Sequence, residues 1–363
     1  MVVRDVFLRV SKALGLFRLA RRITPGGLRI LCYHGVALEN EHAFLPKMFI
    51  SPRTFERRLT FLADQGFPVL PLDEAVSRLR QGMLPSGATA ITFDDALYGT
   101  YCMAWPLLKR FAAPATVYVT TYYVTKRAPV FGLLVEYLFW KTTKPSLDLE
   151  GLGLPSAGTV VLSDAAVRAR VAEAIVDHGE TRCTEEQRSS LARALAGRLG
   201  IDYEALARNR LFNLMTPEEI RELAAGGLDM QAHTHRHQFP EDEVVVLREF
   251  ADNRAVLEPL TGKRLEHFCY PSGFWSEQHW AWLAAAGFKT ATTCEPGFNY
   301  RETPCLALRR FLDGEHISDL EFEAEMCGYK ELFRRGRVLL WRTLGRPAGP
   351  PAAEAATGAR MSS

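Results

Sequence analysis

The sequence predicts an α/β protein in which parallel strands alternate with helices, arranged as a sheet or a barrel. Short apolar runs rich in β-branched and aromatic residues alternate with longer amphipathic stretches along most of the chain. Apolar residues make up 47% of the 363 residues, which suits a large globular domain. One stretch, residues 125–213, interrupts the alternation, so we expect an insertion there.

Six apolar runs have the length and composition of buried strands. They are LRILCY (28–33), ATAITF (88–93), ATVYVTT (115–121), LDMQA (228–232), LEHFCY (265–270) and KTATT (289–293). The helices predicted between and after them are SPRTFERRLTFLADQGF (51–67), PLDEAVSRLRQG (71–82), TYCMAWPLLKRFAA (100–113), TPEEIRELAAGG (216–227), EVVVLREFADNRAVLEPLTG (243–262) and SEQHWAWLAAAGF (276–288).

Helix-start signals support two of these helices. Ser51 is the expected N-cap of the first, with Pro52 at the first helical position. Thr216, followed three residues later by Glu219, predicts a capping box at the start of another.

The insertion contains helical stretches but no convincing strand pair, and we expect a helical lid or a substrate wall. The predicted segments are a basic amphipathic N-terminal helix (1–27), a first barrel part (28–124), the helical insertion (125–213), a second barrel part (214–328), a basic C-terminal helix (329–345) and a disordered tail (346–363).

Both ends of the folded part are basic and apolar. Residues 1–22 are amphipathic, and charged residues interrupt them too often for a signal peptide. Residues 332–342 have a similar composition. Two interpretations stay open: peripheral contact with an anionic membrane surface through these termini, or packing on the main domain. No stretch is long and apolar enough to span a membrane.

Charge and cysteine content limit partners and compartment. The net charge is only +2, so we expect no nucleic acid partner. Seven cysteines without a spacing pattern indicate reduced thiols. We therefore expect a cytoplasmic protein, peripheral at the inner membrane face if its basic ends bind lipid.

Polar residues follow four of the predicted strands. His34 follows the first strand, Asp94 and Asp95 follow the second, three histidines lie within 233–237, and a Pro-Ser-Gly turn occupies 271–273. Taken singly, paired aspartates are more often a turn or a helix cap, and a lone histidine is usually structural. Because the carboxyl ends of parallel strands converge on one face, their coincidence predicts an active site.

The residue types at this face suit a catalytic metal. Two imidazoles and one carboxylate form a three-ligand site that leaves one position open for water, as in catalytic zinc sites. The metal lowers the pKa of water and polarises a carbonyl group. A second carboxylate can accept the water's proton, and the two adjacent aspartates can divide these roles between them.

Three of these motifs together resemble a known family. TFDD, HTHRH and YPSG resemble the polysaccharide deacetylases, the NodB-like carbohydrate esterases of family four, over roughly residues 28–125 and 214–328. The resemblance implies a distorted (β/α) barrel, here with a helical insertion, and one divalent metal. YHGV near the start, followed by SPRTFERRLTFLADQGFPVLPLDEAV, resembles the circularly permuted branch associated with exopolysaccharide loci.

The resemblance also implies a role for each motif residue. The general base is Asp94, the metal ligands are Asp95, His233 and His237, the acid that protonates the leaving amine is His34, and the oxyanion donor is the backbone N–H of Ser272. We expect Zn²⁺, and Co²⁺ or Ni²⁺ would suit the same ligands. His235 falls on a spacer position, and we expect it to point towards the groove or solvent.

Two positions depart from the family pattern. Ala96 stands where the family has glycine, which implies modest strain if that position needs a positive φ. Cys269 replaces the arginine that usually holds the catalytic aspartate, and Arg310 in LALRRF is the expected substitute, in preference to Arg309.

The function implied is metal-dependent hydrolysis of an N-acetyl or other N-acyl group on an amino sugar. The substrate partner would be a polysaccharide, an oligosaccharide or a lipid-linked glycan. The alternative is a catalytically inactive carbohydrate-binding protein with the same fold. Release of acetate from an N-acetylglucosamine oligomer would distinguish the two.

Overall fold

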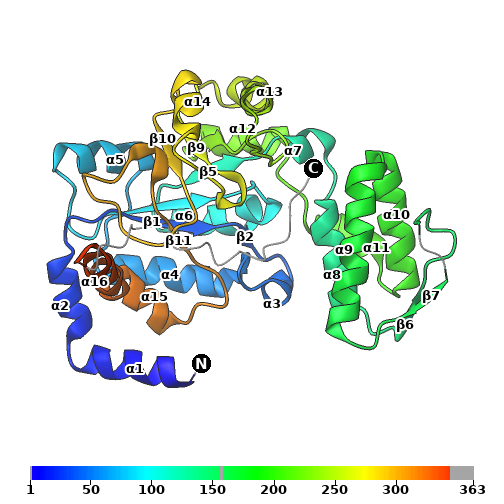
Figure 1. The fold of residues 1–363 in the computed structure, drawn as a ribbon, viewed down its shortest axis with the longest axis horizontal. Coiled ribbons are helices and arrows are strands. Elements are labelled where there is room, and N and C mark those ends of the chain that lie inside the picture. The colour runs from blue at the N-terminus through cyan, green and yellow to red at the C-terminus, as the bar shows by residue number, and fades with distance from the viewer. Residues whose placement is uncertain (1, 156–157, 344–363) are drawn as a thin grey trace.

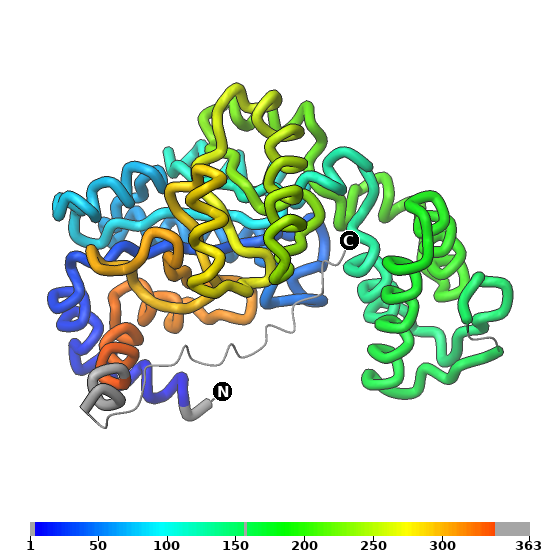
Figure 2. The backbone as a smooth tube through the Cα atoms, turned by 45° about the horizontal axis from the view of Figure 1, so that its top comes forward, coloured from blue at the N-terminus to red at the C-terminus, as the bar shows by residue number. Residues whose placement is uncertain are grey.

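The computed structural model describes residues 2–155 and 158–343, and the side chains of 4–155 and 158–337. The predicted tail, 346–363, lies outside the described residues. Helices surround a curled sheet, and a lobe of mostly helical structure stands beside it (Figure 1). The tube view shows the same two parts, joined through the segments on either side of the lobe (Figure 2).

The main sheet has seven strands, and all its strand pairs are parallel, as predicted. β1 and β4 are buried along their whole length, because helices cover the outer face of the curled sheet and side chains fill its inside. In spatial order the strands are β10 (Thr290–Thr292), β9 (His267–Cys269), β8 (Asp229–Ala232), β5 (Thr116–Val119), β4 (Thr89–Phe93), β1 (Arg29–Tyr33) and β11 (Phe311–Leu312).

One short segment connects the two edges of the sheet. Leu308 forms a parallel bridge with Thr292 beside β10, and Phe311 pairs with Leu31 of β1. The chain from 308 to 312, which includes the edge strand β11, therefore contacts both β10 and β1, and the curled sheet is a distorted (β/α) barrel, as the sequence predicted. Arg310 lies between the two contacts.

Helices cover the outside of the barrel. The predicted N-cap is confirmed, because the Ser51 side chain accepts a hydrogen bond from the Thr54 N–H. The capping box of Thr216 and Glu219 is also present. The covering helices are α4 (Pro52–Asp64), α5 (Leu72–Gln81), α6 (Trp105–Arg110), α12 (Pro217–Ala225), α13 (Glu243–Thr261), α14 (His279–Ala285) and α15 (Asp319–Met326).

Shorter elements complete the barrel part. A π-helical turn precedes α6, so the helix predicted over 100–113 is only partly α-helical. The short elements are β2 (Gly35–Val36), α3 (Glu41–Phe44), β3 (Phe49–Ile50), the π-turn (Thr100–Ala104) and 3-10 turns at Pro271–Gly273 and Cys305–Ala307.

The N-terminal segment forms two helices where the sequence predicted one. α1 (Val2–Ala13) and α2 (Leu16–Ile23) are separated at Gly15, whose φ of 77° lies in the left-handed region that ends a helix. α16 (Tyr329–Thr343) lies beside α2 and α15.

The lobe contains a strand pair that the sequence analysis did not predict. β6 (Ser146–Asp148) and β7 (Thr159–Val161) form an antiparallel pair of three residues each, too short to show an alternating pattern. The expectation of no strand pair in this stretch is therefore wrong. The lobe's helices are α8 (Phe131–Lys141), α9 (Ala165–Arg182), α10 (Glu185–Arg198) and α11 (Tyr203–Arg208), and α7 (Tyr122–Lys126) precedes them. The exact segment boundaries stay predictions.

Candidate metal and catalytic site

Three side chains from two strand ends face one another. Nε2 of His233 lies 3.4 Å from Oδ1 of Asp95, and Nε2 of His237 lies 3.6 Å from the same oxygen. Asp95 follows β4 and His233 follows β8, so the parallel sheet brings together residues more than a hundred positions apart. These three residues form one of the clusters that could hold a metal ion.

The donor set fits a divalent metal. Oδ1 of Asp95 is buried and has no hydrogen-bond partner, which is costly unless a cation binds it. Nδ1 of His233 lies 2.8 Å from the Cys269 carbonyl oxygen, which can only accept, so Nδ1 donates and Nε2 keeps its lone pair. Two ligand atoms that each lie about 2.1 Å from a tetrahedral metal are roughly 3.4 Å apart. The distances from Asp95 Oδ1 to Nε2 of His233 and of His237 are close to this separation.

The backbone around this cluster adopts an uncommon conformation. Asp95, Ala96, Thr234, His237 and Ser272 all have φ between 56° and 70°. Non-glycine residues rarely adopt this region, and such residues concentrate at functional sites. Ala96, at the position where the family has glycine, has a φ of 67°, so the positive φ that implies modest strain is present.

Asp94 is paired with Arg310 inside the protein. Nη1 and Nη2 of Arg310 donate to the two carboxylate oxygens at 2.7 and 2.8 Å, and both side chains are buried. Arg309 is exposed, so the contact expected from Arg310 is present. Burial raises the pKa of the Asp94 carboxyl, but the Arg310 guanidinium outweighs burial and holds this pKa far below its ordinary value.

Thiols complete the surroundings of Asp94, and the sequence analysis singled out only Cys269 among them. Sγ of Cys32 and Sγ of Cys269 each lie 3.5 Å from Oδ2 of Asp94, and Sγ of Cys294 lies 3.9 Å from Nη2 of Arg310. Burial raises the pKa of the Cys32 thiol well above its ordinary value, so this thiol is a neutral donor. The position of Cys32 two residues before His34 was the available signal.

His34 and Ser272 complete the predicted set. Nε2 of His34 lies 3.8 Å from Oδ2 of Asp94, and its side chain is 23% exposed, so solvent or a ligand can reach it. Ser272 lies in the exposed turn that follows β9. The structure thus brings His34, Asp94 and Arg310 into one cluster beside the three candidate metal ligands. The chemical roles of all seven residues stay predictions.

His235 does not point where the sequence analysis expected. Its ring is half-buried, with Nδ1 2.8 Å from Oγ1 of Thr121 and a T-shaped contact to the Tyr122 ring at 5.9 Å. It therefore faces α7 and not the groove or solvent. The spacing of the histidines gave no information about the neighbouring helix.

Asn253, which the sequence analysis did not single out, fixes the loop that holds the histidines. Its side-chain amide donates to the backbone carbonyls of Thr234, at 2.6 Å, and Val119, at 2.9 Å. Asn253 lies in the middle of α13 and is fully buried. An isolated asparagine within a helix has no sequence pattern that would distinguish it.

Comparisons of sequence match part of the chain to known proteins. The model of the polysaccharide deacetylase family matches residues 180–291, which include the histidine loop and the Pro-Ser-Gly turn. YxkH of Bacillus subtilis (strain 168), whose name places it among the polysaccharide deacetylases, is 32% identical over 96 residues. That alignment covers 26% of this chain and 32% of YxkH, so the chain spans about a third of the curated relative it matches.

Solved structures share the fold. The deacetylase PplD of Streptococcus pyogenes, in complex with acetate, has a TM-score of 0.54 at 19% identity, covering 84% of this chain and 99% of PplD. IcaB from Ammonifex degensii has a TM-score of 0.51 at 19% identity, covering 83% of this chain and 96% of IcaB. The predicted circular permutation stays a prediction. The polysaccharide deacetylase model thus matches residues 180–291, and the curled parallel sheet of the whole chain is similar to that of solved deacetylases.

Proposed function

We propose that the protein is a metal-dependent carbohydrate deacetylase that removes an N-acetyl or other N-acyl group from an amino sugar. One observation supports this most. A complete donor set for a metal, Asp95, His233 and His237, lies beside a carboxylate, Asp94, that is buried, ionised and oriented by a guanidinium. This combination suits hydrolysis of an amide, because it supplies both an activated water and an acceptor for its proton.

Each residue has a distinct task in this proposal. The metal would lower the pKa of water and polarise the acyl carbonyl. Asp94 accepts the proton of the attacking water, and its pair with Arg310 keeps the carboxylate oriented and charged. His34, close to Asp94 and partly exposed, donates a proton to the departing amine. The Ser272 N–H stabilises the oxyanion. Zn²⁺ is our proposal for the metal, and Co²⁺ or Ni²⁺ would suit the same donors.

The substitution Asp94→Asn tests this function. It keeps the three ligands and removes the proton acceptor, so we expect metal binding to persist and acetate release from N-acetylglucosamine oligomers to stop. Asp177→Asn, on the exposed surface of α9, is the matched control. Chelation should abolish release by the wild-type protein, and added Zn²⁺ should restore it. Turnover retained by Asp94→Asn would contradict the base assignment.

The inactive carbohydrate-binding alternative makes the opposite prediction. If the metal-loaded protein released no acyl group from a broad panel of glycans and glycolipids, yet bound one of them, that alternative would replace the proposed enzyme.

We also propose that the helices at the two ends bind an anionic membrane surface. Seven large apolar side chains, each 50% to 71% exposed, form what we call the apolar end face. Phe7 and Phe333 both contact the Tyr329 ring, so the face continues from α1 to α16. Its members are Val6, Phe7, Val10, Leu14, Leu19, Ile23 and Phe333.

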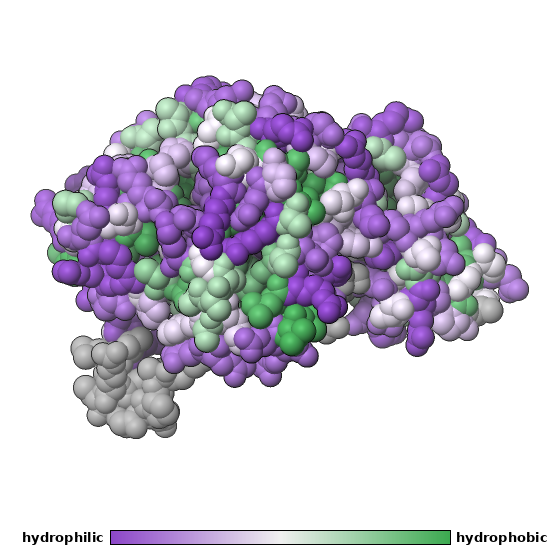
Figure 3. All heavy atoms as spheres, turned by 90° about the horizontal axis from the view of Figure 1, so that it is seen from above, coloured by the Kyte–Doolittle hydropathy of each residue, from purple (hydrophilic) through white to green (hydrophobic). Residues whose placement is uncertain are grey.

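Packing on the main domain uses other residues of the same helices. Leu8, Phe17 and Ala20 are buried against α15 and Tyr329, which leaves the apolar end face uncovered by the rest of the described chain. Arg18 and Arg22 are exposed on α2 and form no ion pair with another described residue. Apolar side chains beside free basic ones suit anionic lipid headgroups. The face seen from above, over α13 and α14, mixes hydrophilic and apolar side chains (Figure 3), and Val244 of α13 is 69% exposed.

Vesicle binding tests the membrane proposal. Leu14→Glu places a charge in the apolar end face, and Met83→Glu, at a site 61% exposed after α5, is the matched control. Burying one leucine side chain contributes about 1.5–3 kcal/mol, so we expect at least about tenfold weaker binding of Leu14→Glu to phosphatidylglycerol vesicles. Salt should weaken binding of the wild-type protein. Equal binding by the two variants would exclude this surface.

The place of the protein in the cell is a separate proposal. None of the described helices is both long enough and apolar enough to cross a membrane. We propose a cytoplasmic location, peripheral at the inner membrane face, and fractionation of cells that produce the full chain would test it.

A further inference from the structure

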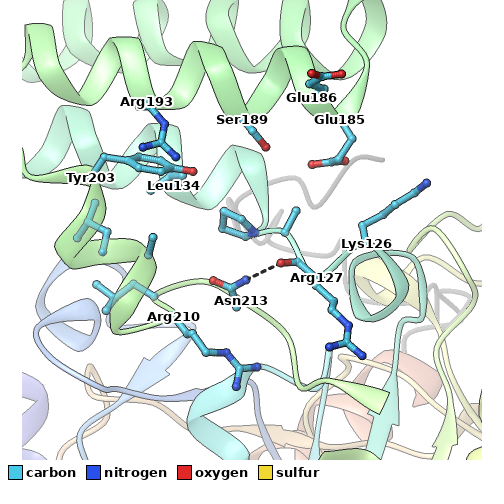
Figure 4. Close-up of a pocket in the computed structure, with 15 residues that line it drawn as sticks. Lys126, Arg127, Leu134, Glu185, Glu186, Ser189, Arg193, Tyr203, Arg210 and Asn213 are labelled. Carbon is cyan, nitrogen blue, oxygen red and sulfur yellow. Dashed lines mark hydrogen bonds between the residues drawn. The ribbon is translucent and has the colours of Figure 1, made fainter. Parts of the chain in front are cut away.

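A cavity of about 470 Å³, lined entirely by residues between 126 and 213, lies on the side of the lobe where Arg127 and Arg210 pair with α12 of the barrel. Its volume is typical of sites for small organic ligands. Figure 4 shows Glu185, Ser189 and Arg193 of α10 facing Lys126, Arg127 and Asn213 across its open centre. We call it the junction cavity. We propose that it is a saccharide subsite, which binds a distant sugar of the chain that is deacylated at the metal site. This inference rests on the proposed function.

Polar groups without ion pairs and apolar carbons both line the junction cavity. The side chains of Lys126, Glu186 and Ser189 line it, and none forms an ion pair or hydrogen bond with another described residue. Leu134 and the ring of Tyr203 provide apolar surface. A sugar ring has hydroxyl groups at its edges and C–H groups on its faces, so it can satisfy both kinds of surface at once.

The charges of the cavity favour such a ligand over an anion. Its three arginines already have carboxylate partners: Arg127 pairs with Glu218, Arg193 with Glu204, and Arg210 with Glu219. One lysine and two glutamates remain, and Glu185 lies 3.7 Å from Arg188. This near balance offers no excess positive charge for a phosphate, whereas hydroxyl and amine groups can bond to either sign.

One short helix links the cavity to the metal loop. At the start of α7, the Tyr122 N–H donates to the His235 carbonyl at 2.8 Å. Lys126, four residues later, lines the cavity, which places it about 6 Å further along the helix axis. The lobe also contacts this helix directly, because the Tyr122 hydroxyl lies 3.4 Å from both Glu185 and Arg188.

The separation of the junction cavity from the metal ligands favours an oligosaccharide or a polymer as the substrate. A single amino sugar at the metal cannot also occupy the junction cavity, but an oligosaccharide or polymer can. Binding of a remote sugar contributes energy that holds the reacting unit in place. We therefore infer that longer chains of N-acylated amino sugars are better substrates than short ones.

A matched pair of substitutions on α10 tests this inference. Ser189→Trp fills the cavity with an indole ring, whereas Ser190→Trp places the same ring on the exposed side of the same helix. The measurement is acetate release from N-acetylglucosamine dimers and hexamers by the metal-loaded full chain. In the wild-type protein we expect kcat/KM to be larger for the hexamer. In Ser189→Trp we expect the hexamer-to-dimer ratio of kcat/KM to fall about tenfold, through KM, and in Ser190→Trp to stay within twofold.

Two results would overturn the subsite. One is a hexamer-to-dimer ratio that is equal in both variants, and the other is a wild-type enzyme that does not prefer the hexamer. Absence of all acetate release would instead contradict the proposed function. In that case calorimetric binding of the hexamer decides the matter: binding weakened by Ser189→Trp but not by Ser190→Trp supports the subsite, and any other result excludes it.

Discussion

At the scale of single residues, Asp94 has an environment suited to a permanently charged base. Two parallel hydrogen bonds from Arg310 satisfy its oxygens, and the thiols of Cys32 and Cys269 add weak donors. A carboxylate buried without such partners would become protonated or would destabilise the fold. Arg310 therefore determines both the charge of Asp94 and the direction in which its oxygens point.

Arg310→Met should damage stability and turnover together. Removing the guanidinium leaves a buried carboxylate unpaired, which costs about 3–5 kcal/mol. Loss of orientation should lower kcat roughly 100-fold or more. Urea unfolding and acetate release measure the two effects. Arg309→Met, at the exposed neighbouring position, is the control and should change neither.

If Arg310→Met does not fold, Arg310→Lys replaces it. Lysine keeps the positive charge but cannot donate two parallel hydrogen bonds. Unchanged kcat in Arg310→Lys would show that charge alone is sufficient and would contradict the orienting role.

The sequence predicted which residues come together better than it predicted their surroundings. Asp94, Asp95 and the histidines follow strands, and strand ends converge in any parallel sheet, so their proximity followed from the pattern. The orientation of His235 did not, because it depends on α7, which is distant in sequence. The role of Asn253 could not be predicted for the same reason, because its hydrogen-bond partners are backbone carbonyls of two other segments.

At the scale of elements, the ends of helices were predictable and the breaks between them were not. Ser51 and Thr216 cap helices as their sequences indicate, since capping involves residues only a few positions apart. The division of the N-terminal segment at Gly15 was missed, because glycine within an amphipathic pattern is often tolerated. The β6–β7 pair was missed because each strand has only three residues.

The start of α4 should make stability depend on pH. Glu315 accepts hydrogen bonds from the Ser51 N–H and from the hydroxyls of Ser51 and Thr54. Burial raises the pKa of the Glu315 carboxyl, but these donors outweigh burial and hold it below its ordinary value. A pKa that is lower in the folded state gives stability that is present above the unfolded pKa, about 4.3, and is lost as pH falls.

Glu315→Gln therefore should be less stable than the wild-type protein at neutral pH. The difference in free energy of unfolding should shrink as pH falls below about 4, because the wild-type carboxyl becomes neutral there. Urea unfolding at several pH values measures it, with exposed Glu302→Gln as the control. A difference that stays constant with pH would show that the charge of Glu315 contributes nothing.

At the scale of the whole molecule, the alternation of strands and helices predicted the architecture, and the insertion interrupted it as expected. The sequence did not indicate where the lobe would lie. Its position depends on contacts such as those of Tyr122 with Glu185 and Arg188, between segments more than sixty residues apart. The junction cavity brings together residues from 126 to 213, which are distant in sequence, so no local pattern could have predicted it.

The segment that closes the barrel also determines when the candidate site is completed during synthesis and folding. During synthesis the N-terminal part of a chain emerges and folds first. Asp94, Asp95 and the histidine loop leave the ribosome well before residues 308–312, which place Arg310 between β10 and β1. Until that last strand docks, Asp94 lacks its counter-charge. A nascent or truncated chain would therefore lack the complete candidate site, and we expect the proposed activity to appear only when the barrel is finished.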